Sequence, residues 1–220
     1  MKKTPSQVAI FDLDYTLLEG DSEALWSQFL FQKGLVGREF VARVDDYYRE
    51  YEWGQLDFIK YEEFLLQPLT LHPPEMLFQL RNEYLERIQL LIRPMMLERV
   101  NWHRAQGHTL LLITATNSFL AEPIAVLLSF PNLICTIVKR TGNSFTNQID
   151  HIPAFGEGKV QLLGQWLAEH SLTLEGSWGY SDSHNDLPLL NRVEHPVAVR
   201  PDYMLRVYAQ EHGWSIIADA

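Results

Sequence analysis

The sequence predicts an α/β protein built on a doubly wound, Rossmann-like parallel sheet with an inserted helical cap. Three observations lead to this fold class. Short apolar runs that suit buried strands alternate with stretches that have helical spacing. Several of these runs end in polar residues, as strands do where a parallel sheet binds ligands. A long stretch between Leu18 and Pro94 has helical patterns but no strand pattern.

The first predicted strand runs from Val8 to Phe11, and two carboxylates, Asp12 and Asp14, follow it directly. A carboxylate that leaves water costs several kcal/mol unless it is paired or bound to a cation. Mg²⁺ is the simplest partner for such a pair, since it prefers carboxylate and carbonyl oxygens. The alternative is a pair of loop carboxylates in water.

Residues 19–93 are predicted to form the helical cap, and residues 1–18 and 94–220 the catalytic core. Three apolar stripes at helical spacing run through the cap, separated by prolines at 68, 73 and 74. Two short segments, Glu19-Gly20 and Arg93-Pro94, are the expected hinges. Closure of such a cap excludes water from the site below it.

A second predicted strand, Leu110 to Ile113, leads into Thr114, Ala115, Thr116 and Asn117 before a helix. Hydroxyl and backbone N–H groups at a strand end form an anion site. The alternative is that Thr116 or Asn117 only caps the helix that begins near Ser118.

Residues 143–157 are predicted to form a short hairpin followed by a loop, which leads into Gly158 and Lys159 at the start of another helix. A lysine in the first turn opposes the helix macrodipole, so its position needs a reason. A bound anion provides one, although a solvated surface lysine is the commoner case.

A short strand beginning at Trp178 runs into a polar turn that contains Asp182, Asn185 and Asp186. Turn formation and capping explain one of these residues but not all of them. Beyond the turn we expect a strand over Pro196–Val199, a helix over Asp202–His212 and an edge strand at residues 214–217.

The composition narrows the classes of function. A formal net charge of −10 argues against a nucleic-acid groove. The single cysteine, Cys135, lies within an apolar run and allows no disulfide framework within the chain. The Met1-Lys2-Lys3 start lacks an apolar segment of signal-peptide length, and no run approaches a membrane span. We therefore expect a cytoplasmic monomer or homodimer that acts on a small molecule.

The order of the polar strand ends resembles that of the haloacid dehalogenase (HAD) superfamily. The shared pattern is D-x-D-x-T, a threonine after a strand, a lysine and a D-x-x-x-D turn. More narrowly, the chain is similar to the phosphoserine-phosphatase-like branch, subfamily IB. The matching blocks are Asp12 to Leu18, Thr114 to Asn117, Gly158-Lys159 and Ser181 to Pro188.

The resemblance implies a role for each matching residue. Asp12 becomes the nucleophile that forms an aspartyl-phosphate, and Asp14 the general acid and base. Thr114 and Lys159 hold the phosphoryl oxygens. Mg²⁺ is held by Asp12, the Asp14 carbonyl and Asp182, with Asp186 in support. The implied substrate-binding residues are Thr16, Asp21, Ala115, Asn117 and Asn185.

The resemblance predicts a Mg²⁺-dependent phosphomonoesterase for a small, amino-alcohol-like phosphorylated metabolite. Phosphoserine and histidinol phosphate are the candidates. Asp21 stands where phosphoserine phosphatases have a substrate-binding Glu, and it also suits the role of a helix cap. Arg43 and Arg49 are candidates for binding a substrate carboxylate. A phosphate-binding regulatory protein without turnover and a phosphotransferase are the other functions open to this scaffold.

Overall fold

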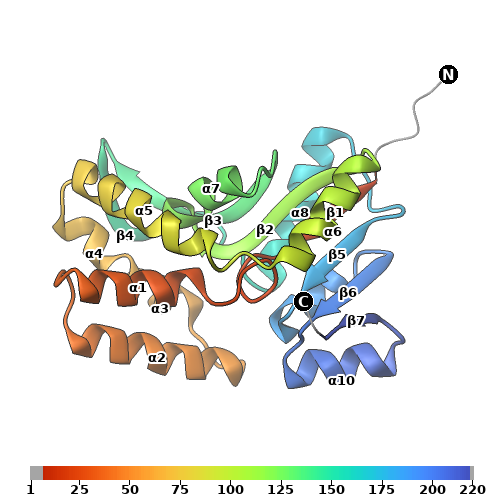
Figure 1. The fold of residues 1–220 in the computed structure, drawn as a ribbon, viewed down its shortest axis with the longest axis horizontal. Helices are drawn as coiled ribbons and strands as arrows, with labels where there is room; N and C mark the ends of the chain where they lie inside the picture. Colours follow the sequence, from red (N-terminus) through yellow and green to blue (C-terminus); the bar gives the residue numbers. More distant parts are fainter. Residues whose placement is uncertain (1–6, 219–220) are drawn as a thin grey trace.

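The computed structural model describes residues 7–218 and contains one seven-stranded sheet (Figure 1). The strand order is β4-β3-β2-β1-β5-β6-β7, and every pair is parallel except β3 with β4. The predicted fold class is therefore confirmed. The strands are β1 (Val8–Phe11), β2 (Thr109–Asn117), β3 (Leu133–Thr141), β4 (Ser144–Asp150), β5 (Trp178–Ser181), β6 (His195–Val199) and β7 (Ser215–Ile217).

Helices cover both faces of the sheet because its central strands are apolar on both sides. Alternate residues of β1 and β2 enter two separate cores. Phe11 and Leu112 pack with α6 (Pro94–Ala105) and α7 (Ser118–Leu127). Ile10 and Ile113 pack instead with α8 (Glu157–His170). The remaining helices of the core are the 3₁₀ turn η1 (His184–Asp186), α9 (Leu187–Leu190) and α10 (Tyr203–Glu211).

The segment predicted as the cap holds five helices between β1 and β2 (Figure 1). They are α1 (Ser22–Gln32), α2 (Arg38–Glu52), α3 (Phe58–Leu65), α4 (Gln67–Leu71) and α5 (Pro74–Gln89). The chain enters and leaves this segment at one place, where Leu18 and Ile92 form an antiparallel bridge. The backbone N–H of Glu19 donates to Leu91, and the Arg93 side chain donates to the Leu18 carbonyl.

The structure corrects the sequence analysis at the end of β2. The predicted strand ended at Ile113, but β2 continues to Asn117 and α7 begins at the next residue. The register between β2 and β3 shifts between Ile113 and Asn117, so the strand end is irregular but still paired. The polar residues are thus held by strand backbone, which positions them more rigidly than a loop would.

The hairpin expected within residues 143–157 begins earlier, because its first strand is β3 and only its second strand, β4, falls in that range. The loop after β4 leads into α8 as expected. Within the part of the chain that the structure describes, no helix is both long and apolar enough to cross a bilayer. The Met1-Lys2-Lys3 start, on which the expectation about a leader depends, lies outside the described residues.

Candidate active site

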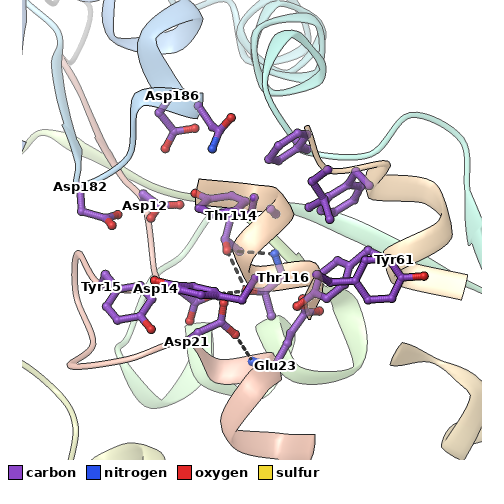
Figure 2. A pocket seen from close by; sticks show the side chains of 18 of the residues that line it. Asp12, Asp14, Tyr15, Asp21, Glu23, Tyr61, Thr114, Thr116, Asp182 and Asp186 are labelled. Atoms are coloured by element: carbon purple, nitrogen blue, oxygen red, sulfur yellow. Dashed lines mark hydrogen bonds between the residues drawn. The ribbon is translucent and has the colours of Figure 1, made fainter. Parts of the chain in front are cut away.

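The candidate site lies at the carboxyl ends of β1, β2 and β5. Strand order reverses direction between β1 and β5, which is where ligands bind in open α/β sheets. A cavity at this place is roofed by side chains from α2 and α3 (Figure 2). Its walls are formed by Asp12, Asp14, Tyr15, Asp21, Glu23, Tyr47, Tyr48, Tyr51, Leu56, Phe58, Tyr61, Thr114, Ala115, Thr116, Phe155, Lys159, Asp182, Asn185 and Asp186.

Lys159 lies between two carboxylates at the start of α8. Its Nζ is 2.8 Å from Asp12 Oδ1 and 2.8 Å from the Asp186 carboxylate, and all three side chains are nearly buried. The preceding residue must be small, since a Cβ on Gly158 would come within 2.0 Å of the Pro153 carbonyl oxygen. This close approach turns Lys159 inward, so the surface-lysine alternative is excluded.

Asp12 remains ionised at neutral pH because of this ion pair. Burial raises the pKa of Asp12 to about 6, while the positive charge of Lys159 works against that rise. The two charges also raise the pKa of Lys159, which keeps the ammonium protonated. The site therefore holds a buried carboxylate next to a fixed cation, an arrangement suited to nucleophilic attack on a phosphorus atom.

Asp14 favours the protonated form at neutral pH, whereas Asp12 is ionised. Burial, followed by the negative charge of Asp21, raises its pKa to about 8. Its Oδ1 accepts from the Ser22 N–H at 2.7 Å and its Oδ2 accepts from the Thr116 hydroxyl at 2.6 Å. Two neighbouring aspartates with pKa values pushed apart are the usual arrangement of a nucleophile and a general acid.

Thr116 links Thr114 to Asp14, a connection that the sequence analysis did not predict. The Thr114 hydroxyl donates to Thr116 Oγ1 at 3.0 Å, and Thr116 in turn donates to Asp14. Both threonines are buried at the end of β2 and line the cavity. The signal was available, because residues two apart on a strand face the same side.

Asp182 follows β5, and among residues 7–218 its carboxylate forms no salt bridge of the kind that Asp12 and Asp186 form with Lys159. Its Oδ1 accepts from the Thr16 hydroxyl at 3.1 Å. Burial, followed by the charges of Asp12 and Asp186, raises the pKa of Asp182 well above its ordinary value. A divalent cation between Asp12 and Asp182 would remove this repulsion, so the donor set fits a hard ion such as Mg²⁺.

Protein side chains alone do not complete such a site. Among residues 7–218, no three His, Cys, Asp or Glu side chains come together as a set of metal ligands. Asp186, one of the expected ligands, binds Lys159 and accepts from the Ser181 hydroxyl at 2.7 Å. A cation held by Asp12 and Asp182 would therefore also need main-chain oxygen, water and substrate oxygen, as Mg²⁺ commonly does.

Two further carboxylates lie at the other end of the cavity. Figure 2 shows Asp21 and Glu23 on one side of Asp14, and Asp12, Asp182 and Asp186 on the other. Asp21 is the N-cap of α1, and its Oδ1 accepts from the N–H groups of Glu23 and Ala24, both at 2.8 Å. Both expected roles of Asp21 are thus geometrically open, since it caps the helix and also lines the cavity.

The structure separates the expected substrate-binding residues into two groups. Ala115, Asn185 and Asp21 line the cavity. Thr16 and Asn117 are not among the residues that line it, so a role for either in binding substrate stays a prediction. The Thr16 hydroxyl is fully buried against Asp182, and Asn117 donates its backbone and side-chain N–H groups to Glu23. Glu23 itself was not predicted.

The cavity offers a single cation to a ligand. Within the described part of the chain, Lys159 is the only Lys or Arg among the cavity-lining residues. Arg43 and Arg49, the candidates for binding a substrate carboxylate, are exposed on α2 instead. Arg43 lies over the Tyr47 ring and near Asp46, and Arg49 pairs with Asp46. Neither arginine is among the residues that line the cavity.

This fold and this pair of aspartates define a class of protein, the α/β enzymes that transfer phosphoryl groups at the carboxyl edge of a parallel sheet. Residues 9–191 match the family model described as haloacid dehalogenase-like hydrolase. The chain belongs to this family, and it is a phosphatase.

Similar proteins support the assignment. The chain is 40% identical over 217 residues to a histidinol-phosphatase of Neisseria meningitidis, covering 96% of this chain and 97% of the relative. A crystal structure of a Bordetella pertussis protein of unknown function has a TM-score of 0.90 and 38% identity, covering 97% of this chain and 99% of that one. A substrate-bound phosphoserine phosphatase structure has a TM-score of 0.75 and 14% identity, covering 99% of this chain and 95% of that one. This similarity shows that the two proteins share the fold.

Proposed function

We propose that this phosphatase hydrolyses the phosphate ester of an amino alcohol that has no carboxylate, with histidinol phosphate as the substrate. The observation that carries the proposal is the charge of the cavity. Its one cation, Lys159, is already paired with two aspartates, while Asp21 and Glu23 add negative charge at the far end. A cationic head group complements this end of the cavity, whereas a substrate carboxylate would be repelled.

Phosphoserine fits the same cavity poorly. Its carboxylate would enter a buried acidic region with no arginine or lysine left to pair with it, and an unpaired buried charge costs several kcal/mol. Histidinol phosphate carries an amine and an imidazole ring instead. The 40% identity to a histidinol-phosphatase over nearly the whole of both chains supports the same choice.

In the proposed mechanism, Asp12 attacks phosphorus and forms an aspartyl-phosphate, while Asp14 gives its proton to the departing alkoxide. Asp14, now ionised, takes a proton from the water that hydrolyses the intermediate. Thr116 orients Asp14 through its hydroxyl. Lys159 and Thr114 lie where they can hold the phosphoryl oxygens. Mg²⁺ held by Asp12, Asp182 and the Asp14 carbonyl would neutralise phosphate charge.

The alternative of a binding protein without turnover is less well supported. Binding phosphate alone needs cations and N–H groups, and it gains nothing from a buried carboxyl that stays protonated near neutral pH. A phosphotransferase needs the same groups as a hydrolase. The two are distinguished by whether an added alcohol competes with water for the phosphoryl group.

A panel of phosphate esters tests the proposal. We expect phosphate release in the presence of Mg²⁺ to have the highest kcat/KM for histidinol phosphate, well above the values for phosphoserine and glycerol phosphate. A chelator should abolish release. Equal or higher kcat/KM for phosphoserine would contradict the proposal.

Replacing Asp182 tests the proposed metal site. Asp182→Ala removes a charged oxygen ligand, so we expect the Mg²⁺ concentration for half-maximal activity to rise by about tenfold or more. Mg²⁺ titrations of activity and calorimetric titrations of binding measure this shift. Asp45→Ala is a matched control, because it makes the same chemical change at an exposed position of α2 that does not line the cavity. An unchanged Mg²⁺ requirement in Asp182→Ala would remove Asp182 from the site.

Replacing Asp21 tests how the amine is recognised. Asp21→Asn keeps an oxygen for capping α1 but removes the charge. We expect kcat/KM for amine-bearing phosphates to fall by about one to two orders of magnitude relative to that for a neutral aryl phosphate, the size of a lost charged hydrogen bond. Equal losses on the two kinds of substrate would leave Asp21 as a helix cap only.

A further inference from the structure

Behind the cavity wall lies a group of buried polar side chains that the proposed mechanism does not use. Glu23 from α1, Glu62 from α3 and Asn117 from the end of β2 are 5%, 0% and 4% exposed. Asn117 donates its backbone N–H to Glu23 Oε1 at 2.9 Å, and its side-chain amide donates to the same oxygen. Glu23 is the member that lines the cavity.

This group has more acceptors than donors. Both carboxylate oxygens of Glu62 and Oδ1 of Asn117 are buried without a hydrogen-bond partner among residues 7–218. Glu62 adjoins the carboxyl of Glu23, and a proton shared by the two carboxyls would satisfy only part of this set. Buried acceptors that lack donors are costly. Because Glu23 alone of the three lines the cavity, a ligand that brings N–H groups can relieve this shortage only through Glu23.

The pKa shifts of Glu23 and Glu62 also favour a ligand that brings N–H groups. Burial, followed by the charge of Glu62, raises the pKa of Glu23 well above its ordinary value, and burial raises the pKa of Glu62 to about 8. No described Lys or Arg lines this part of the cavity, so the carboxyl of Glu23 favours its protonated form when the cavity is empty. A positively charged ligand would bring N–H donors and favour the ionised form of Glu23.

Aromatic rings form the wall beside this group. The rings of Tyr61, Tyr47 and Phe58 line the same cavity as Glu23. The Tyr61 ring centroid is 5.5 Å from that of Tyr47 and 6.2 Å from that of Phe58. Flat electron-rich faces of this kind suit a planar cation.

We propose that Glu23, backed by Glu62 and Asn117, binds the imidazolium ring of the substrate and thereby selects which phosphate ester the cavity accepts. The inference rests on the proposed function. A protonated imidazole has two N–H donors on a flat ring, which matches a surplus of acceptor oxygens beside aromatic faces. Asp21 remains the residue for the amine, since it lines the cavity closer to Asp14.

The test compares histidinol phosphate with 2-aminopropyl phosphate, the same amino-alcohol ester without the ring. The measured quantity is the ratio of the two kcat/KM values. Glu23→Gln is expected to lower this ratio by about 10-fold to 100-fold, mainly through a higher KM for histidinol phosphate. Glu62→Gln is expected to lower the ratio by about tenfold, because its amide donates to Glu23 and competes with the ring.

Glu63→Gln is the matched control, since it makes the same chemical change at the exposed neighbour of Glu62 on α3 and should leave the ratio unchanged. A second substrate tests the inference in the wild-type enzyme, where folding of a variant is not at issue. Histidinol phosphate methylated on the ring nitrogen remote from the side chain has lost one N–H group. Its kcat/KM should be about tenfold lower than that of the parent ester.

The possible outcomes separate the two proposals. If the wild-type enzyme has no higher kcat/KM for histidinol phosphate than for phosphoserine, the proposed function fails, and this inference fails with it. If it hydrolyses histidinol phosphate and 2-aminopropyl phosphate equally well, the function stands and the ring site is wrong. If the wild-type enzyme prefers histidinol phosphate but Glu23→Gln and Glu62→Gln keep that preference, the function stands and the ring site is wrong. Full tolerance of the methylated ring in the wild-type enzyme would also overturn the ring site.

Discussion

Asp12→Asn is expected to remove at least 99% of the phosphatase turnover while leaving the fold intact. The neutral amide cannot attack phosphorus, so the covalent step is lost. A loss of this size corresponds to about 2.7 kcal/mol or more of transition-state stabilisation. The measurement is kcat for histidinol phosphate at saturating Mg²⁺, with enzyme purified free of host phosphatases.

Thermal unfolding provides the control for this variant. The substitution keeps the shape of the side chain, and Lys159 keeps its second partner, Asp186, so the protein should still unfold cooperatively. Turnover above a few per cent of the wild-type value in a folded Asp12→Asn enzyme would show that Asp12 is not the nucleophile.

Asp14→Asn should lower kcat on alkyl phosphates by about 10² to 10⁴-fold, the usual contribution of a general acid. The amide keeps an oxygen that can accept from the Ser22 N–H but has no acidic proton. An aryl phosphate such as p-nitrophenyl phosphate releases its phenolate without protonation, so the first step survives in the variant. Because Asp14 also activates the water of the second step, we expect a burst of one equivalent of p-nitrophenolate followed by slow turnover.

The pH dependence of the wild-type enzyme should report the same group. Asp14 must be protonated to donate, and burial next to Asp21 raises its pKa to about 8. Because Asp12 must be ionised and its pKa is about 6, turnover of alkyl phosphates should be sustained between about pH 6 and pH 8 and fall as the pH rises through the pKa of Asp14. The fall should be absent in Asp14→Asn. A wild-type rate that keeps rising beyond pH 9, or a variant that shows no burst, would contradict the assignment of Asp14 as the acid.

The parts of the fold that were predictable are those whose signal is local. A continuous apolar run such as Val8 to Phe11 is typical of a strand buried on both faces, and the polar residues after it must lie at the carboxyl edge. The continuation of β2 to Asn117 was not predictable in this way. Its last residues are polar, and they remain in the strand because β3 pairs with them across a shift in register.

The candidate site also has one part that was predictable from a local sequence signal and one part that was not. Four of the site residues have a clear place in the sequence pattern: Asp12, Asp14 and Asp182 follow strands, and Lys159 begins a helix. Their positions in the sequence were therefore enough to predict that they lie close together. Glu23 and Glu62 come from two helices of the predicted cap, and only tertiary packing shows that their carboxyls meet. A signal was present for Glu62, which shares a helical face with the apolar residues Phe58 and Leu65 and is therefore a charged residue on a buried stripe.

The antiparallel bridge between Leu18 and Ile92, where the helical insertion begins and ends, affects how this protein can change over evolutionary time. Both ends of the helical insertion are anchored at one point, so the entropy of closing the insertion depends only weakly on its length. Residues within the insertion, including Glu62 and Tyr61, can be replaced without altering the pairing of β1 with β2. The insertion itself can also be lengthened or shortened without altering that pairing. A change in the insertion can therefore alter one wall of the cavity while Asp12, Lys159 and Asp182 stay in place, so a new specificity can arise while the hydrolytic chemistry is inherited unchanged.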